Sequence, residues 1–116
     1  MRISENEKRG SVELLLLALL KEEDMYGYQL AQELAERSGG RYKLQESSMY
    51  PILYRMIDKG LISDRRELVG KRRVRVYYHM ENEGLLYYEQ ALKDYLLTVG
   101  GVLEILGKRI VDDEDN

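Results

Sequence analysis

The stretch ESSMYPILYRMIDKGL, residues 46–61, has the pattern of an amphipathic helix with a proline and several hydroxyl side chains near its front. Its apolar residues recur at i, i+3, i+4, i+7 and i+8, the spacing of a core-facing stripe: Met49, Ile52, Leu53, Met56 and Ile57. The pattern predicts a helix that begins at Ser47 or Ser48 and ends at Gly60. Pro51 suits the front of such a helix, because the first N–H groups there have no intrahelical partner.

The opposite face of this helix is small and polar at its front end. At 100° per residue that face presents Ser47, Ser48, Pro51, Tyr54 and Arg55, with Tyr50 on the flank. A face of this kind suits entry into a groove better than a protein interface, which needs apolar anchors. Tyr54 fits two positions equally well, on this face or packed beneath a neighbouring element.

Two further helices precede it. Ser11 can cap a helix with the body VELLLLALL, which is apolar nearly all the way round and so predicts burial on more than one side, including by a partner subunit. The stretch MYGYQLAQELAERSGG, residues 25–40, has helical apolar spacing and a Gly39–Gly40 stop. Gly27 and Gly60 are interpreted as glycines that the backbone conformation requires and that make no contact with a partner.

After Gly60 the apolar period changes from that of a helix to that of strands. LISDRREL, residues 61–68, and RRVRVYYHM, residues 72–80, predict two strands joined through a basic tip that contains glycine. In the second strand an apolar set alternates with a largely cationic one: Val74, Val76 and Tyr78 against Arg73, Arg75 and Tyr77. A hairpin after three helices predicts a winged helix-turn-helix domain, mainly α with a small β-hairpin.

Charge is distributed unevenly along the chain. Residues 59–78 hold seven cations and two anions, although the whole chain has a net charge of −3. Such a cluster indicates either a solvated loop or a site for a polyanion. A winged helix-turn-helix domain with a basic site for a polyanion suggests binding to DNA. Because the chain as a whole is acidic, there is also an alternative: a winged-helix dimer that acts as a protein-interaction module and binds no DNA.

A long helix is predicted beyond Asn82, which can cap it. Its apolar seam has no cover within a small domain and predicts pairing with the first helix of a second subunit. The expected dimerisation residues are Leu15, Leu16, Leu19, Leu85, Leu92, Leu96, Val99, Leu103 and Leu106, and Ile110 continues the seam. Gly100–Gly101 predicts a kink, a break or a close helix crossing.

Three segments follow from these patterns. Residues 1–80 form the winged-helix DNA-binding domain, with residues 1–10 as a flexible arm, residues 81–111 form the C-terminal dimerisation helix, and residues 112–116 form an acidic tail. No cysteine, no secretory signal and no apolar run long enough to cross a bilayer predict a cytoplasmic protein without a membrane partner.

The motifs YGYQLAQEL, SSMYPILYRMIDKGLI and KRRVRVYYHMENEG resemble, in order and spacing, those of the PadR family of bacterial transcriptional regulators. The resemblance covers about Ser11 to Gly84. It implies a DNA-binding transcriptional regulator, which we expect to be a repressor. Met80–Glu81–Asn82 departs from the Leu-Thr that usually follows the wing, and Ser47–Ser48–Met49 departs from the usual Gly-Thr-Leu. These departures affect capping and sequence preference more than the fold.

In the helix-turn-helix geometry the front of the recognition helix enters the major groove, and a wing lies along the adjacent groove. The expected DNA-binding residues are Ser47, Ser48, Tyr50, Pro51, Tyr54, Arg55, Lys71, Arg72, Arg73 and Arg75. Double-stranded DNA and a second copy of the chain are therefore the expected partners.

All ten aromatic residues are tyrosines, and a buried tyrosine must satisfy its hydroxyl. Tyr87, Tyr88 and Tyr95 near the dimer seam are candidates for a pocket that takes a small planar or phenolic effector, with plain packing as the alternative. No catalytic or metal-binding site and no cofactor are expected, because the chain has one histidine, His79, no cysteine and no phosphate-binding glycine loop.

Overall fold

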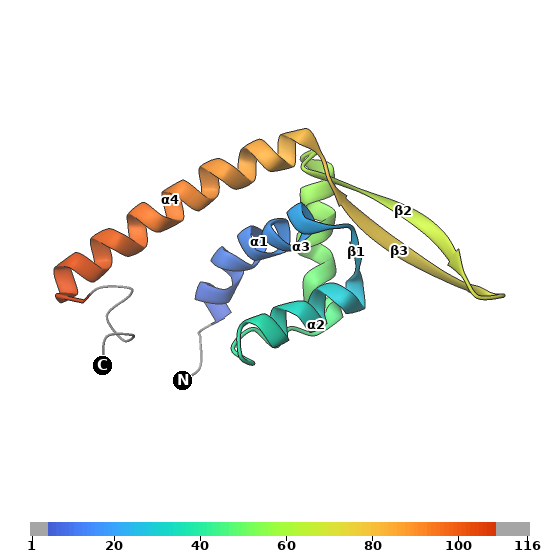
Figure 1. The fold of residues 1–116 in the computed structure, drawn as a ribbon, viewed down its shortest axis with the longest axis horizontal. Coiled ribbons are helices and arrows are strands. Elements are labelled where there is room, and N and C mark those ends of the chain that lie inside the picture. Colours follow the sequence, from blue (N-terminus) through green and yellow to red (C-terminus); the bar gives the residue numbers. More distant parts are fainter. Residues whose placement is uncertain (1–4, 109–116) are drawn as a thin grey trace.

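The computed structural model describes residues 5–108, with side chains from Ser11 onward. Its elements are α1 (Glu5–Glu22), β1 (Met25–Tyr26), α2 (Gly27–Arg37), α3 (Glu46–Asp58), β2 (Ile62–Val69), β3 (Arg73–Met80) and α4 (Asn82–Leu106). The predicted fold class is confirmed: three helices and a hairpin, here called the wing (β2, β3 and the turn between them), form a winged helix (Figure 1). The long α4 follows this unit.

Helix α1 is the centre of the core. Five of its apolar side chains are buried: Val12, Leu16, Leu17, Leu19 and Leu20. The helix packs against α2, β3 and α4 of the same chain. These contacts explain why α1 is apolar on several sides without a partner subunit. It begins at Glu5, before the predicted cap at Ser11, and the Ser11 hydroxyl instead lies 2.6 Å from that of Tyr42.

The sheet has three antiparallel strands in the order β1-β3-β2. The wing is paired over its whole length, from Ile62 opposite Met80 to Val69 opposite Arg73. The predicted strands are thus confirmed to within a residue or two at each end. The two-residue strand β1 pairs with Tyr77 and Tyr78 and was not predicted, because two residues carry no recognisable alternation.

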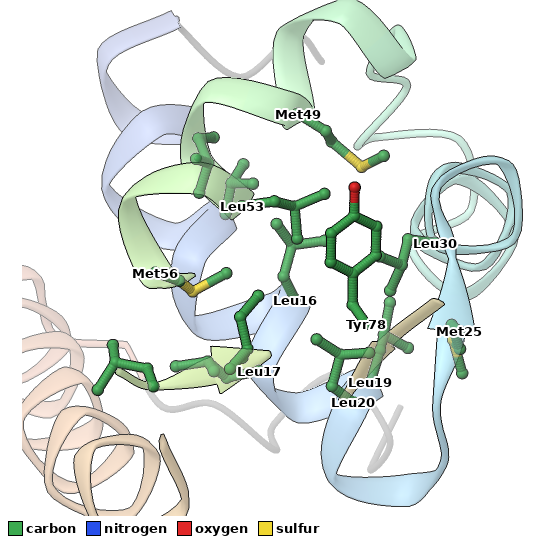
Figure 2. Close-up of a cluster of buried hydrophobic side chains, with 14 of the residues drawn as sticks. Leu16, Leu17, Leu19, Leu20, Met25, Leu30, Met49, Leu53, Met56 and Tyr78 are labelled. Atoms are coloured by element: carbon green, nitrogen blue, oxygen red, sulfur yellow. The ribbon is translucent and has the colours of Figure 1, made fainter. Parts of the chain in front are cut away.

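Tyr78 fastens the wing to the helices. Its side chain is 2% exposed, and Figure 2 shows the ring between Leu30 and Leu53, with the hydroxyl toward Met49. Burial raises the pKa of Tyr78 to about 12. Val76 also packs against this core, so Val76 and Tyr78 of β3 both hold the wing against the helical unit.

Helix α4 begins beside the base of the wing, runs along α1 and then extends beyond the helical unit (Figure 1). The N-cap is Glu81, one residue before the predicted Asn82. The helix continues through Gly100–Gly101 to Leu106, so of the three alternatives expected there a break does not occur, and a kink or a close helix crossing stays a prediction. Gly107 ends the helix in a left-handed conformation. Ile110, residues 1–4 of the predicted arm and the acidic tail lie outside the described residues.

Candidate nucleic-acid interface

The faces of α3 are divided as its apolar spacing predicts. Met49, Ile52, Leu53 and Met56 are buried. The opposite face is exposed at its expected positions: Ser47, Ser48, Pro51, Tyr54 and Arg55. Tyr50 on the flank is partly buried, and its ring stacks on that of Tyr54 with the centroids 6.1 Å apart.

The front of α3 differs from the prediction in one respect. The helix begins at Glu46, with Gln45 as an N-cap that makes no side-chain capping bond, rather than at Ser47 or Ser48. Pro51 therefore lies beyond the first turn, where its missing N–H removes one intrahelical hydrogen bond, and not at the front of the helix as predicted. Because Pro51 cannot donate to the carbonyl of Ser47, that exposed carbonyl remains able to accept a hydrogen bond from outside the helix.

An open groove of about 620 Å³ separates α3 from the wing. We call it the α3–wing groove. Side chains of the helical unit form one wall: Tyr26, Tyr28, Glu46, Tyr50 and Tyr54. Residues 73–76 of β3 form the other wall, and Gly27 and Tyr78 complete the lining. Tyr54 is 55% exposed and lines this groove, so it lies beside the wing and is not buried beneath it.

Glu46 and Tyr50 form a hydrogen-bonded pair inside the α3–wing groove. The Tyr50 hydroxyl donates to Glu46 Oε2 at 2.7 Å, across one helical turn. This hydrogen bond is the main reason why the pKa of Tyr50 is raised to about 12. Gly27 leaves room for the pair, because a Cβ at that position would stand 2.9 Å from the Tyr50 hydroxyl oxygen.

The tip of the wing is cationic and uncovered. Gly70 has a φ of +72°, which allows the tight turn that presents Lys71, Arg72 and Arg73. None of these three cations forms an ion pair with a described residue, so their charges are available to a partner. The cross-strand neighbours Leu68 and Val74 beside the tip are also exposed.

Arg75 is less free than the tip residues. Its side chain is partly buried, and its guanidinium lies 4.2 Å from the centroid of the Tyr26 ring. This stacking brings the cation to the base of the α3–wing groove, where Arg75 is one of the lining residues. Of the expected DNA-binding residues, the structure thus places Tyr50, Tyr54, Arg73 and Arg75 around one groove.

A charged cluster at the base of the wing was not found by sequence reasoning. Asp24, in the loop after α1, accepts hydrogen bonds from Arg65 of β2 and shares one of 2.7 Å with Nδ1 of His79 on β3. Arg65 also donates to Glu67. Burial opposes ionisation of Asp24, but the hydrogen bonds from His79 and Arg65 outweigh it and lower its pKa. The cluster joins both wing strands to the helical unit.

The expected dimerisation residues fall into two groups. Leu16 is completely buried in its own chain and cannot contact a partner, which corrects the prediction for that residue. Leu19 is also buried, but it lines an apolar groove of about 310 Å³ between α1 and α2, together with Leu15, Leu34 and Tyr42. We call this the α1–α2 groove. The α4 residues Leu85, Leu92, Val99 and Leu103 are half-buried, and Leu96 and Leu106 are exposed.

Helix α4 carries many large apolar side chains that are exposed in the described part of the chain. Its exposed apolar side chains include Leu86, Leu96, Leu97, Val102, Ile105 and Leu106. Ile105 alone is 88% exposed. Several large apolar side chains exposed on one helix are typical of an interaction site.

The three tyrosines proposed for an effector do not share one pocket. Tyr87 and Tyr95 line an open groove of about 300 Å³ between α1 and α4, together with Glu13 and Asp94. The Tyr87 hydroxyl donates to Glu13 at 2.7 Å, and this bond raises the pKa of Tyr87. Tyr88 instead lies under the ammonium of Lys21 and does not line this groove.

The described residues hold no group of three side chains that could bind a metal ion. None of the described helices has the length and hydropathy needed to cross a bilayer.

Comparison with known proteins gives one family. Residues 16–90 match the model of the transcriptional regulator PadR-like family. A transcriptional regulator from Clostridium thermocellum is 29% identical, with a TM-score of 0.79 over 88% of this chain and 96% of that one. A PadR-like transcriptional regulator from Bacillus cereus is 27% identical, with a TM-score of 0.78 over 90% of this chain and 100% of that one.

Two further matches are more distant or less informative. The structure of Bacillus subtilis PadR in complex with operator DNA has a TM-score of 0.65 and covers 70% of this chain and 47% of that one. At 23% identity it shows a common fold. An uncharacterized protein X from Lysinibacillus sphaericus is 28% identical over 87 residues, which are 75% of this chain and 80% of that protein.

Proposed function

Because this chain belongs to the PadR-like family of transcriptional regulators, which are not enzymes, we propose that it binds specific duplex DNA as a homodimer and represses transcription. The observation that carries the proposal is the α3–wing groove. The polar front of α3 and the cationic tip of the wing stand on its two sides, and both are exposed.

We propose that this surface takes one strand of a duplex. With the front of α3 in the major groove, the wing reaches the neighbouring groove, and the strand between them lies in the α3–wing groove. Its phosphates face the guanidinium groups of Arg73 and Arg75, and the edges of its bases face the α3 wall. Lys71 and Arg72 at the tip extend the phosphate contacts beyond the groove.

Dimerisation is proposed from the uncovered surface of α4. The apolar side chains at its far end have no partner among the described residues of the chain. The α1–α2 groove offers a second apolar site, lined by residues of α1 and α2. Seating α4 of each subunit against α1 of the other gives a two-fold dimer and two recognition helices for two half-sites.

Repression follows if the dimer covers promoter DNA and excludes the transcription machinery. The proposal extends to release by a small planar or phenolic effector, for which the groove with Tyr87 and Tyr95 is the site in this chain. Such a ligand would stack on a tyrosine ring of α4 and change the packing of that helix against α1.

The salt dependence of binding tests the proposal. The affinity for promoter fragments, including the one upstream of its own gene, should fall steeply as salt rises, because each neutralised phosphate releases counterions. In the variant Arg72→Ala/Arg73→Ala a dimer loses two cations from each wing. The slope of log affinity against log salt should then become shallower by roughly 3 to 4. A matched control, Lys93→Ala/Lys108→Ala, removes the same charge from α4 and from the segment that follows it, and should leave the slope unchanged.

A second candidate is a dimer that uses the wing to dock an acidic protein and binds no DNA. The net charge of −3 favours this alternative, because an acidic protein is repelled by DNA as a whole. Binding to promoter fragments that is absent, or that does not respond to salt, would support this candidate and contradict the DNA-binding proposal.

A further inference from the structure

Glu46 is the one carboxylate among the side chains that line the α3–wing groove. The wall opposite to it carries Arg73 and Arg75, and the remaining polar groups of the lining are tyrosine hydroxyls. A carboxylate repels phosphate, so its presence in a surface proposed to bind DNA requires an explanation. As the first residue of α3, Glu46 lies where a recognition helix meets the edges of bases.

The hydrogen bond between Tyr50 and Glu46 fixes what both side chains can still do. A tyrosine hydroxyl has a single proton, and that of Tyr50 is donated to Glu46 Oε2. The Tyr50 oxygen can then only accept a further hydrogen bond, and the ionised carboxylate of Glu46 is also an acceptor. The pair therefore presents acceptors alone and cannot bind a phosphate, which offers no donor.

We propose that Glu46 and Tyr50 together read an exocyclic amino group, that of cytosine, in the major groove. This inference rests on the proposed DNA-binding function and assigns these two residues a role in sequence preference. It also changes the expectation for Tyr50, from a contact with the DNA backbone to a contact with a base.

The choice among bases follows from their major-groove edges. Guanine presents only acceptors there, and thymine presents an acceptor and a methyl group. Adenine presents an amino donor, but its N7 acceptor lies beside that donor and would face the second acceptor of the pair. Cytosine presents the one free N–H of its amino group without a neighbouring acceptor on the same base, so neither acceptor of the pair faces an acceptor of that base.

Gly27 belongs to the same arrangement. Its backbone has no positive φ, so the glycine is not needed for its conformation. A Cβ there would stand 2.9 Å from the Tyr50 hydroxyl oxygen and 3.4 Å from Glu46 Oε2. The glycine therefore provides the space that lets the two side chains meet.

The test compares base preference in four proteins: wild type, Glu46→Gln, Tyr50→Phe and the control Glu36→Gln. Glu36 is an exposed residue of α2 that does not line the groove. Duplexes selected by the wild-type dimer are first searched for a preferred cytosine in each half-site. Fluorescence anisotropy then measures the affinity of each protein for duplexes that carry each of the four bases at that position.

The expected result is a roughly tenfold loss of discrimination for Glu46→Gln, the size of one good base contact. Its amide can still accept from Tyr50, but it adds a donor that tolerates guanine and thymine. Tyr50→Phe should lose part of the discrimination, and Glu36→Gln none. The salt slope should stay the same in all four proteins, because no phosphate contact is removed.

Two results would overturn the inference while leaving the DNA-binding proposal intact. One is wild-type binding without a preferred cytosine in the half-sites. The other is a Glu46→Gln protein that binds every duplex more weakly by the same factor, since this would give Glu46 only a structural role. Circular dichroism of each variant confirms that a changed preference comes from a folded protein. A wild-type protein that binds no DNA would refute the proposed function itself.

Discussion

Gly84→Ala is expected to destabilise the protein, although alanine is the better helix former. Gly84 lies in the first turn of α4 and is buried against Leu61, which directly precedes β2. A Cβ at this position would stand 2.0 Å from the carbonyl oxygen of Leu61 and 2.7 Å from Sδ of Met80. Because carbon and oxygen do not approach below about 3 Å, the backbone must move by about 1 Å.

The size of the effect follows from three contributions. Overpacking of this kind costs about 1 to 3 kcal/mol. The Leu61 carbonyl also accepts a hydrogen bond of 3.0 Å from the N–H of Glu81, and weakening it costs about 1 kcal/mol more. The higher helix propensity of alanine returns about 1 kcal/mol. The net loss in the free energy of unfolding is therefore about 2 kcal/mol, or a Tm lower by on the order of 10 °C.

Thermal and urea unfolding, followed by circular dichroism at one protein concentration, measure this loss. The matched control is Gly100→Ala in the same helix, where a Cβ meets no atom of the described chain within 4 Å. That variant should be stabilised by about 1 kcal/mol, unless a partner helix crosses there. A Gly84→Ala protein as stable as the wild type would show that α4 does not leave the domain against Leu61.

Two further predictions concern the dimer and the base of the wing. Leu96→Asp should turn a dimer into a monomer in sedimentation velocity, because it places a charge in the exposed apolar surface of α4, whereas Lys93→Asp should remain dimeric. Asp24→Asn should lower the Tm at neutral pH, modestly because the ion pairs with Arg65 and His79 are partly screened by water. The pKa of Asp24 is lowered in the folded protein, so its contribution exists above the ordinary pKa and disappears as pH falls through the folded value. The difference in Tm between wild type and Asp24→Asn should therefore be constant above about pH 5 and shrink as the pH falls through the ordinary aspartate pKa of about 3.9 and below it. A difference that does not change over this lower range would contradict the explanation.

The sequence was most informative where one periodic pattern spans an element. The core stripe of α3 and the alternation in β3 predicted both elements and their buried faces. A helix that packs on a core needs an apolar side chain about once per turn, and a strand needs one at every second residue. Boundaries were less predictable. Ser11 and Asn82 have the chemistry of caps, but α1 begins earlier and Glu81 precedes α4, since several residues near a helix end can satisfy the same backbone groups.

Contacts between distant segments could not be predicted from the sequence. Asp24 and His79 are 55 positions apart, and only the pairing of β1 with β3 brings them together. The space that Gly27 provides for Tyr50 depends on how α2 packs on α3. The Glu46–Tyr50 pair is different, because its i, i+4 spacing is visible in the sequence and is typical of a side-chain contact along a helix.

A hydroxyl-radical footprint on a selected promoter fragment tests the central claim most directly. If α3 and the wing bind DNA and α4 pairs two subunits, the footprint should have two-fold symmetry. It should show two protected regions with centres about one helical turn, or a multiple of it, apart, and Leu96→Asp should weaken both together. One protected region without symmetry, or protection that persists unchanged when Arg72 and Arg73 become alanine, would contradict it.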